Sequence, residues 1–386
     1  MNNRTSIPRR LFIGAASAAF GITASGKLSN AQPDKKLTPP SPLRVGVLGY
    51  GPYSHYHFER AILGIGERRQ FKTNMHISHV WVDDYRKNYT GKIWSSGRAA
   101  KLIARRSPEY ILKNSDAQLV KNPEDMIGSV DAVMIIDFDI SARLAEPFLI
   151  EGIPIYVNRP FAPTMSDGRK IMDMSESTST AVFTGSLVPW IFDTRKIKAA
   201  VDRDKLFAFY ADGLNASFCR YVPHGLEFIY SIVGSGVRRV RLTGWNGSNG
   251  YAPSTLPPIV IELEYTAPGE AHPLRGTLLL REKFPHDWWF RGYHTGGLLV
   301  EGGVPNHDGV SLDTGDDHWR VPFLNIIENV FRTNKSPETR DDILHKLATL
   351  LAAHKSAMEE GRWVGLNEIE NHRLPTVIIE KWNEKI

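Results

Sequence analysis

The sequence contains little that could cross-link the chain or hold it in a membrane. Cys219 is the only cysteine among 386 residues, which excludes an intramolecular disulfide. The main apolar stretch, residues 13–24, is about a dozen residues long, whereas an α-helix needs roughly 20 to span a bilayer. We find no internal repeat and no coiled-coil heptad. We therefore expect a globular chain, long enough for two domains, with no stable membrane anchor.

Net charge is also small once the N-terminus is set aside. Residues 1–31 hold four basic side chains and no acidic one, and removing them lowers the formal net charge from +5 to +1. A protein that binds nucleic acid through phosphate contacts needs a basic surface. We therefore expect no nucleic-acid partner.

The first 31 residues resemble an export signal. Pro8-Arg9-Arg10-Leu11-Phe12-Ile13 is a twin-arginine pattern, an Ala/Gly-rich run follows, and Ser29-Asn30-Ala31 offers a small-residue cleavage site. We predict a twin-arginine signal peptide over 1–31 and export to the periplasm, by a route that carries folded proteins. The alternative is a disordered basic tail.

A glycine-punctuated turn follows the first apolar strand-like run. Residues 44–48 lead into Gly49-Tyr50-Gly51-Pro52-Tyr53-Ser54, and a segment with helical character comes next. This order is typical of a strand–turn–helix dinucleotide site. Gly49 permits the tight turn, Gly51 lets the backbone approach a pyrophosphate, and Ser54 is small enough for close helix–strand packing. The phosphates would lie at the helix N-terminus.

The remaining pattern predicts two domains after a Pro-rich linker at 32–42. Between 43 and 164, strand-like and helix-like segments alternate, with strands at 77–82, 131–136 and 153–157. Such alternation predicts a doubly wound parallel sheet, an α/β Rossmann domain. Residues 165–386 show strands at 206–210, 240–242, 259–265 and 274–280, which favour an α+β domain with an open, mainly antiparallel sheet. A final helix should begin at Ser336, as N-cap, and end near Gly361.

An acidic pair follows the second predicted strand. Asp83 or Asp84 could accept both ribose hydroxyls of NAD, and a carboxylate there would repel the 2′-phosphate of NADP. NAD is therefore the expected cofactor, although nearby Arg86 leaves NADP open. The alternative is ordinary solvated charge at a strand end.

No metal site is expected. His55 and His57 follow the glycine turn, but the sequence lacks a second group of ligands at recognisable spacing.

Several segments in a fixed order resemble the glucose–fructose oxidoreductase, inositol dehydrogenase and MocA-like family. They are the turn at 49–54, Asp83-Asp84, the strand ending at 135–137, residues 152–162, His224 to Ile229 before Gly234, and the run from 322 to 364. The resemblance implies a Rossmann domain, an open-sheet second domain that often mediates homo-oligomers, bound NAD or NADP, and oxidation or reduction of a secondary alcohol on a sugar or cyclitol.

Two departures from the family pattern change the expected chemistry. The family's Glu-Lys-Pro reads Asn158-Arg159-Pro160, and the family's Asp four residues before the active-site His reads Arg220. The resemblance implies that Asn158 lies beside the cofactor and that His224 is the general acid/base. Arg159 would orient the substrate oxygen but serve poorly as a proton shuttle, because arginine stays protonated.

The two arginines suggest an anionic substrate. Arg159 and Arg220 could together bind a carboxylate or sulfate, and Trp190 could stack on a sugar face. Alternatively, one arginine pairs with a nearby acid and the chemistry has been lost.

The sequence thus predicts an exported NAD-dependent oxidoreductase of a sugar or sugar derivative. Two alternatives stay open. One is a lyase, epimerase or glycosidase that uses tightly bound NAD without net turnover. The other is a sugar-binding protein on a decayed dehydrogenase scaffold.

Overall fold

The structure is a computed structural model. It describes residues 41–49, 73–82, 112–113, 115–136, 138–214, 218–245, 258–265, 273–281, 286–305 and 320–375. The predicted signal at 1–31 and all but the last two residues of the predicted linker at 32–42 lie outside these ranges.

The first sheet has six strands, all parallel, in the order β3-β2-β1-β4-β5-β6. The strands are β1 (Leu43–Leu48), β2 (Met75–Trp81), β3 (Gln118–Leu119), β4 (Ala132–Ile135), β5 (Ile155–Val157) and β6 (Val182–Thr184). Strand order reverses between β1 and β4, which is where doubly wound sheets bind their ligands, beyond the carboxyl ends of the strands. The predicted Rossmann sheet is confirmed.

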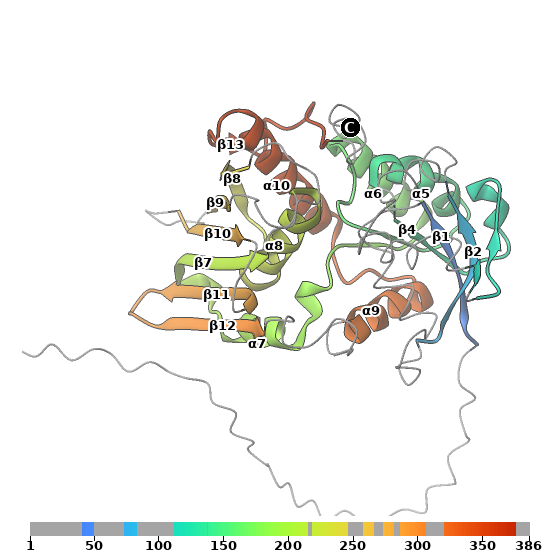
Figure 1. Ribbon diagram of the computed structural model, residues 1–386, viewed down its shortest axis with the longest axis horizontal. Helices are drawn as coiled ribbons and strands as arrows, with labels where there is room; N and C mark the ends of the chain where they lie inside the picture. Colours follow the sequence, from blue (N-terminus) through green and yellow to red (C-terminus); the bar gives the residue numbers. More distant parts are fainter. Residues whose placement is uncertain are drawn as a thin grey trace, which may run out of the picture. The chain divides into compact units, whose positions relative to one another are not determined.

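Helices cover both faces of this sheet (Figure 1). α5 (Ser141–Ile150) and α6 (Met165–Thr178) lie on one side and α9 (Arg320–Thr333) on the other. Strands β4, β5 and β6 are buried on both faces. Alternate residues of β4 point to opposite sides: Val133 and Ile135 belong to the larger core, whereas Met134 belongs to the smaller core with Phe323 of α9. β6 and α9 lie beyond residue 164, so strand pairing continues the parallel sheet past the predicted domain boundary.

The second sheet has seven strands in the order β12-β11-β7-β10-β9-β8-β13. Its strands are β7 (Leu206–Leu214), β8 (Val237–Thr243), β9 (Ile259–Tyr265), β10 (Arg275–Arg281), β11 (His286–His294), β12 (Leu299–Pro305) and β13 (Val364–Gly365). β7 and β10 pair in parallel and the other pairs are antiparallel. The mainly antiparallel sheet is therefore confirmed.

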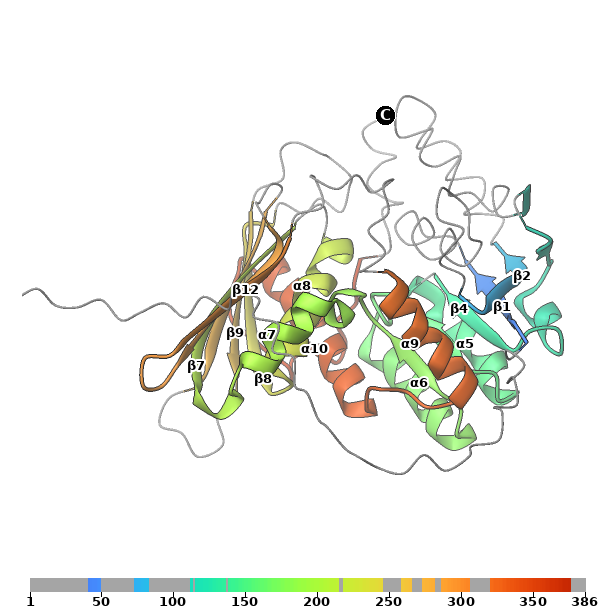
Figure 2. The same ribbon diagram turned by 90° about the horizontal axis from the view of Figure 1, so that it is seen from below.

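Three helices pack on one face of this second sheet (Figure 2). They are α7 (Phe192–Ala200), α8 (Phe218–Val233) and α10 (Arg340–Met358). No described helix covers the opposite face. Short 3-10 helices connect the elements: η1 (Pro123–Met126), η2 (Phe138–Ile140), η3 (Val188–Trp190) and η4 (Arg203–Lys205). None of the described helices is long and apolar enough to cross a bilayer.

The start of α10 differs from the prediction. Thr339, not Ser336, is the N-cap: its side chain accepts from the Asp342 backbone N–H, and the Asp342 side chain accepts from the Thr339 backbone N–H. This reciprocal capping box satisfies two donors that the helix itself leaves unpaired. The sequence offers two possible caps, Ser336 before Pro337 and Thr339 before Asp342. The helix begins at the second because only that pair forms the capping box. Gly361 has a positive φ of 77° just beyond the helix end, as expected.

Candidate active site

The predicted cofactor turn is described only at its first glycine. Gly49 directly follows β1, has a φ of 86°, and donates its backbone N–H to the Trp81 carbonyl at 3.0 Å. This left-handed conformation favours glycine, as the tight turn of a dinucleotide site requires. Gly51, Ser54, Asp83 and Asp84 lie outside the described residues. Gly49 lies at the β1–β4 switch point, so the described part of the turn is compatible with a dinucleotide site.

Asn158 and Arg159 follow β5 at the carboxyl edge of the parallel sheet. The Asn158 backbone N–H donates to the Ile135 carbonyl at 2.8 Å, which ties this segment to the end of β4. The Asn158 Oδ1 accepts from Arg159 Nη1 at 3.0 Å and lies 3.3 Å from the Tyr156 hydroxyl. The guanidinium of Arg159 is therefore tied to the neighbouring Asn158 side chain.

His224 lies on α8, deep against the second sheet. A Cβ at the neighbouring Gly225 would lie only 2.6 Å from the Leu278 side chain, so glycine lets α8 pack closely on β10. His224 is 9% exposed and its ring lies 6.1 Å from the Trp288 ring. Trp288 is itself buried, which favours packing over sugar stacking.

Two of the predicted catalytic residues meet. Arg159 Nε donates to His224 Nε2 at 2.9 Å. Since a guanidinium has no acceptor, the Nε2 lone pair must be unprotonated in this arrangement. The structure thus brings together Asn158, Arg159 and His224 from two separate elements. The side chain of Arg220, one turn earlier on α8, lies outside the described residues.

Trp190 lies apart from this contact. It ends η3, is half-buried, and packs edge-on against Phe183 of β6 with ring centroids 6.0 Å apart. Its position supports a packing role.

Three residues of the site were missed by the sequence analysis. Ser186 follows β6, and its hydroxyl lies 2.5 Å from His224 Nδ1. Glu227, one turn after His224, accepts from the Ser186 backbone N–H at 3.0 Å. Lys346 of α10 lies 3.7 Å from Glu227 and 2.6 Å from Glu338. The sequence signal for Glu227 is its position three residues after His224, on the same face of α8. The signal for Lys346 is a charged residue on an otherwise apolar face of α10.

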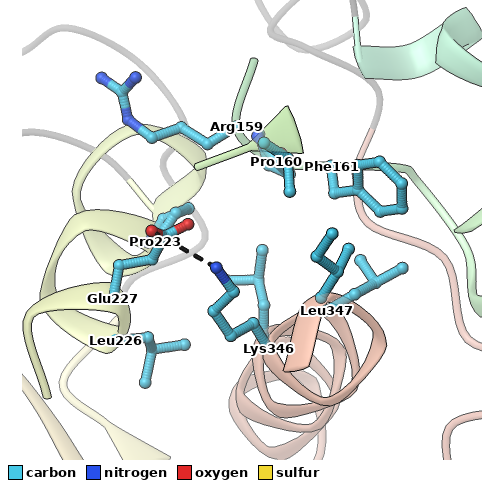
Figure 3. Close-up of a pocket in the computed structure, with 11 residues that line it drawn as sticks. Arg159, Pro160, Phe161, Pro223, Leu226, Glu227, Lys346 and Leu347 are labelled. Atoms are coloured by element: carbon cyan, nitrogen blue, oxygen red, sulfur yellow. Dashed lines mark ion pairs between the residues drawn. The ribbon is translucent and has the colours of Figure 1, made fainter. Parts of the chain in front are cut away.

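Glu227 and Lys346 line a small open pocket. Figure 3 shows the Lys346 ammonium directed at the Glu227 carboxylate, with Arg159 and Pro160 at the rim. Burial raises the pKa of Glu227, and Lys346 opposes that rise. Burial alone would lower the pKa of Lys346, but Glu227 and Glu338 outweigh it and raise that pKa. Glu227 and Glu338 therefore keep Lys346 protonated.

The described residues contain no group of three or more His, Cys, Asp or Glu side chains placed to hold a metal ion.

No protein-family model and no curated protein sequence matches this chain. Solved structures do resemble it. A probable dehydrogenase from Thermotoga maritima is 15% identical, with a TM-score of 0.59 over 85% of this chain and 100% of that one. The myo-inositol dehydrogenase of Lactobacillus casei, solved with NAD(H) and myo-inositol, is 13% identical, with a TM-score of 0.61 over 84% and 96%.

A third structure is GenD2 from gentamicin A biosynthesis, solved with NAD. It is 14% identical, with a TM-score of 0.57 over 85% of this chain and 99% of that one. At identities this low, structural likeness shows a shared fold and not a shared activity. The resemblance drawn from the sequence is confirmed at that level: the chain has the two-sheet fold of these dehydrogenases.

Proposed function

We propose that this protein is an NAD-dependent oxidoreductase acting on a secondary alcohol of a sugar or sugar derivative. The observation that carries the proposal is the contact between His224 and Arg159, at the carboxyl edge of the parallel sheet. Ligands of open α/β sheets bind at this edge. The fold, which resembles that of dehydrogenases, supports the same proposal.

Each member of this pair has a distinct task. His224 is the base, because imidazole is the side chain best suited to reversible proton transfer near neutral pH. It takes the hydroxyl proton at Nε2 once Arg159 turns from that nitrogen to the substrate oxygen. Arg159 orients and polarises that oxygen and keeps its own proton throughout.

Six residues would hold the cofactor. They are Gly49, Gly51 and Ser54 at the phosphates, Asp83 and Asp84 at the ribose, and Asn158 at the edge of the sheet. NAD, when bound, supplies the hydride acceptor. We propose NAD over NADP because the acidic pair would repel a 2′-phosphate.

We further propose an anionic substrate, such as an acidic or sulfated sugar. Arg159 occupies the place of a smaller family lysine, and Arg220 stands one turn before His224. Guanidinium groups bind carboxylate and sulfate in paired hydrogen bonds.

The test is a substrate screen with NAD, comparing uronic, aldonic and sulfated sugars with their neutral counterparts. We expect oxidation of an anionic sugar, and a loss of about 10²–10⁴-fold in kcat/KM for His224→Ala. His76→Ala, a partly exposed histidine on β2, is the matched control. Equal use of neutral sugars would overturn the anionic preference. A His224→Ala variant as active as the parent would overturn the assignment of the base.

The predicted export signal favours a second candidate function. It is that of a lyase, epimerase or glycosidase that holds NAD tightly and turns over without net redox change. A compartment with little free NAD would suit such chemistry. It would form product with no added nicotinamide and with no net change in nicotinamide absorbance.

We also propose that the protein is exported by the twin-arginine route and forms a homo-oligomer. The face of the second sheet opposite α7, α8 and α10 has no described helix on it and supports the second proposal. Light scattering on the purified mature chain checks it, and a monomer at all concentrations would contradict it.

A further inference from the structure

We propose that Ser186 is a positioning residue that fixes the tautomer of His224, and that Glu227, braced by Lys346, holds Ser186 in place. This inference rests on the proposed role of His224 as the base. It concerns residues that neither the sequence analysis nor the fold resemblance assigned.

The hydrogen bonds of the imidazole determine where its proton lies. Arg159 can only donate, so His224 Nε2 accepts and the neutral ring carries its proton on Nδ1. That Nδ1–H points to the Ser186 hydroxyl oxygen, 2.5 Å away. Ser186 has no exposed surface and His224 is 9% exposed, so water does not readily replace this acceptor. The tautomer is the productive one, because it leaves Nε2 to receive a substrate proton.

The Ser186 hydroxyl is itself held in position. Its oxygen also accepts from the Val188 backbone N–H at 3.0 Å, at the start of η3. The Ser186 backbone N–H donates to Glu227 at 3.0 Å. The Val188 contact comes from η3 and holds the hydroxyl, whereas the Glu227 contact comes from α8 and holds the Ser186 backbone.

Glu227 fits against the turn that precedes Ser186. Gly185 has a φ of 115°, and a Cβ at that position would lie 2.6 Å from both Glu227 carboxylate oxygens. The carboxylate therefore packs directly on the backbone of the turn. Lys346, 3.7 Å from Glu227, keeps this buried carboxylate paired. A chain of contacts thus runs from α10 through α8 to the end of β6 and back to His224.

Charged and titratable groups reach this chain from several elements. Arg159 comes from the end of β5 and Tyr221 from α8 itself, with its ring 5.8 Å from that of His224. Glu227, Lys346 and Glu338 lie behind the turn. Because imidazolium donates a stronger hydrogen bond than neutral imidazole, the Ser186 acceptor stabilises the protonated base more than the neutral one.

The experiment compares the parent protein with Ser186→Ala, Ser186→Thr and the control Ser231→Ala. Ser231 lies on the same helix as His224 and donates to the Phe228 carbonyl at 2.7 Å. Nitrogen-15 NMR of histidine-labelled protein reads the tautomer of His224 without any turnover, with His224→Ala giving the signal assignment.

We expect the Nδ1–H tautomer in the parent, in Ser186→Thr and in Ser231→Ala, and a mixed or Nε2–H population in Ser186→Ala. On the substrate found above, Ser186→Ala should lower kcat/KM by about 10-fold or more, and by less than the ~10²–10⁴-fold of a missing base. The acidic limb of its pH profile should move to lower pH, and Ser186→Thr should restore it.

An Nε2–H tautomer in the parent would overturn the inference, as would an unchanged tautomer in Ser186→Ala. Glu227→Gln gives a second test, because it keeps an acceptor for the Ser186 N–H and should leave the tautomer as in the parent. If the parent oxidises no sugar, the proposed function fails, while the NMR result still decides the positioning role.

Discussion

The carboxylate of Glu264, on β9, is buried beneath three arginines. It is 1% exposed and pairs with Arg238, Arg239 and Arg275, whose side chains are 60%, 39% and 64% exposed. Hydrogen bonds and charge from Arg239 and Arg238 lower the pKa of Glu264 from 4.5 to about 2, against the opposing effect of burial. A depressed pKa means that the fold favours the ionised form. Glu264 therefore contributes stability above about pH 4.5, and this stability is lost as the pH falls toward 2.

Replacing Glu264 by Gln should reduce the free energy of unfolding at pH 7 by roughly 1–3 kcal/mol. The loss stays in this range because the arginines left behind are partly exposed to solvent. In addition, the part of the acid dependence between pH 4.5 and 2 that comes from Glu264 should disappear. Urea titrations at several pH values measure both effects.

Glu262→Gln is the matched control for this change. Glu262 lies two residues earlier on β9 and pairs with Arg241 at 2.6 Å, but it is 33% exposed. An exposed pair contributes about 0–1 kcal/mol, so this variant should stay close to the parent. Equal losses for the two variants would contradict the account of Glu264.

The turn between β6 and η3 carries Ser186, which we propose positions His224. Its shape depends on Gly185, whose φ of 115° disfavours a side chain and whose Cα faces the Glu227 carboxylate. Gly236 has the same φ of 115°, yet a Cβ there would meet only Tyr265, at an ordinary 3.6 Å. The two glycines therefore separate backbone strain from the contact with Glu227.

Both Gly185→Ala and Gly236→Ala should destabilise the protein by the strain of a positive φ, about 1–3 kcal/mol. Gly185→Ala should cost a further ~1–3 kcal/mol, because the added methyl forces the buried carboxylate to move. Urea unfolding of the two variants gives the difference. Equal losses would show that Glu227 does not pack tightly on this turn.

Elements were predictable from sequence where their pattern is local. The run 132–136 is apolar throughout because β4 is buried on both faces, and 259–265 matches β9 because its alternation reflects one covered face. The cap of α10 was misplaced because two adjacent signals competed. Arg159 and His224 could be paired only through a family resemblance.

The remaining parts of the site depend on contacts between distant segments. Ser186 is an unremarkable serine in the sequence and becomes significant only because β6 ends beside α8. The partnership of Glu227 with Lys346 requires α8 and α10 to pack together. No local pattern encodes either contact.

At the scale of the whole molecule, the parallel sheet offers the proposed dinucleotide site and α8 carries the proposed base. Hydrogen bonds connect the end of β1 to His224 through the ends of β4 and β5. The Ile136 N–H donates to the Leu48 carbonyl, next to Gly49, the Asn158 N–H donates to the Ile135 carbonyl, and Arg159 donates to His224. A nicotinamide cofactor would therefore lie at the same edge of the sheet as the proposed base.

The most direct measurement of this account is the nicotinamide content of the chain from Gln32, exported through the predicted signal and purified without added nucleotide. One sample is denatured and its supernatant is assayed for NAD and NADP by mass spectrometry. A second, folded sample is titrated with each nucleotide. We predict NAD in the supernatant, or binding of added NAD in preference to NADP. Absence of both, together with no binding at millimolar concentrations, would contradict the proposal of an NAD-dependent oxidoreductase.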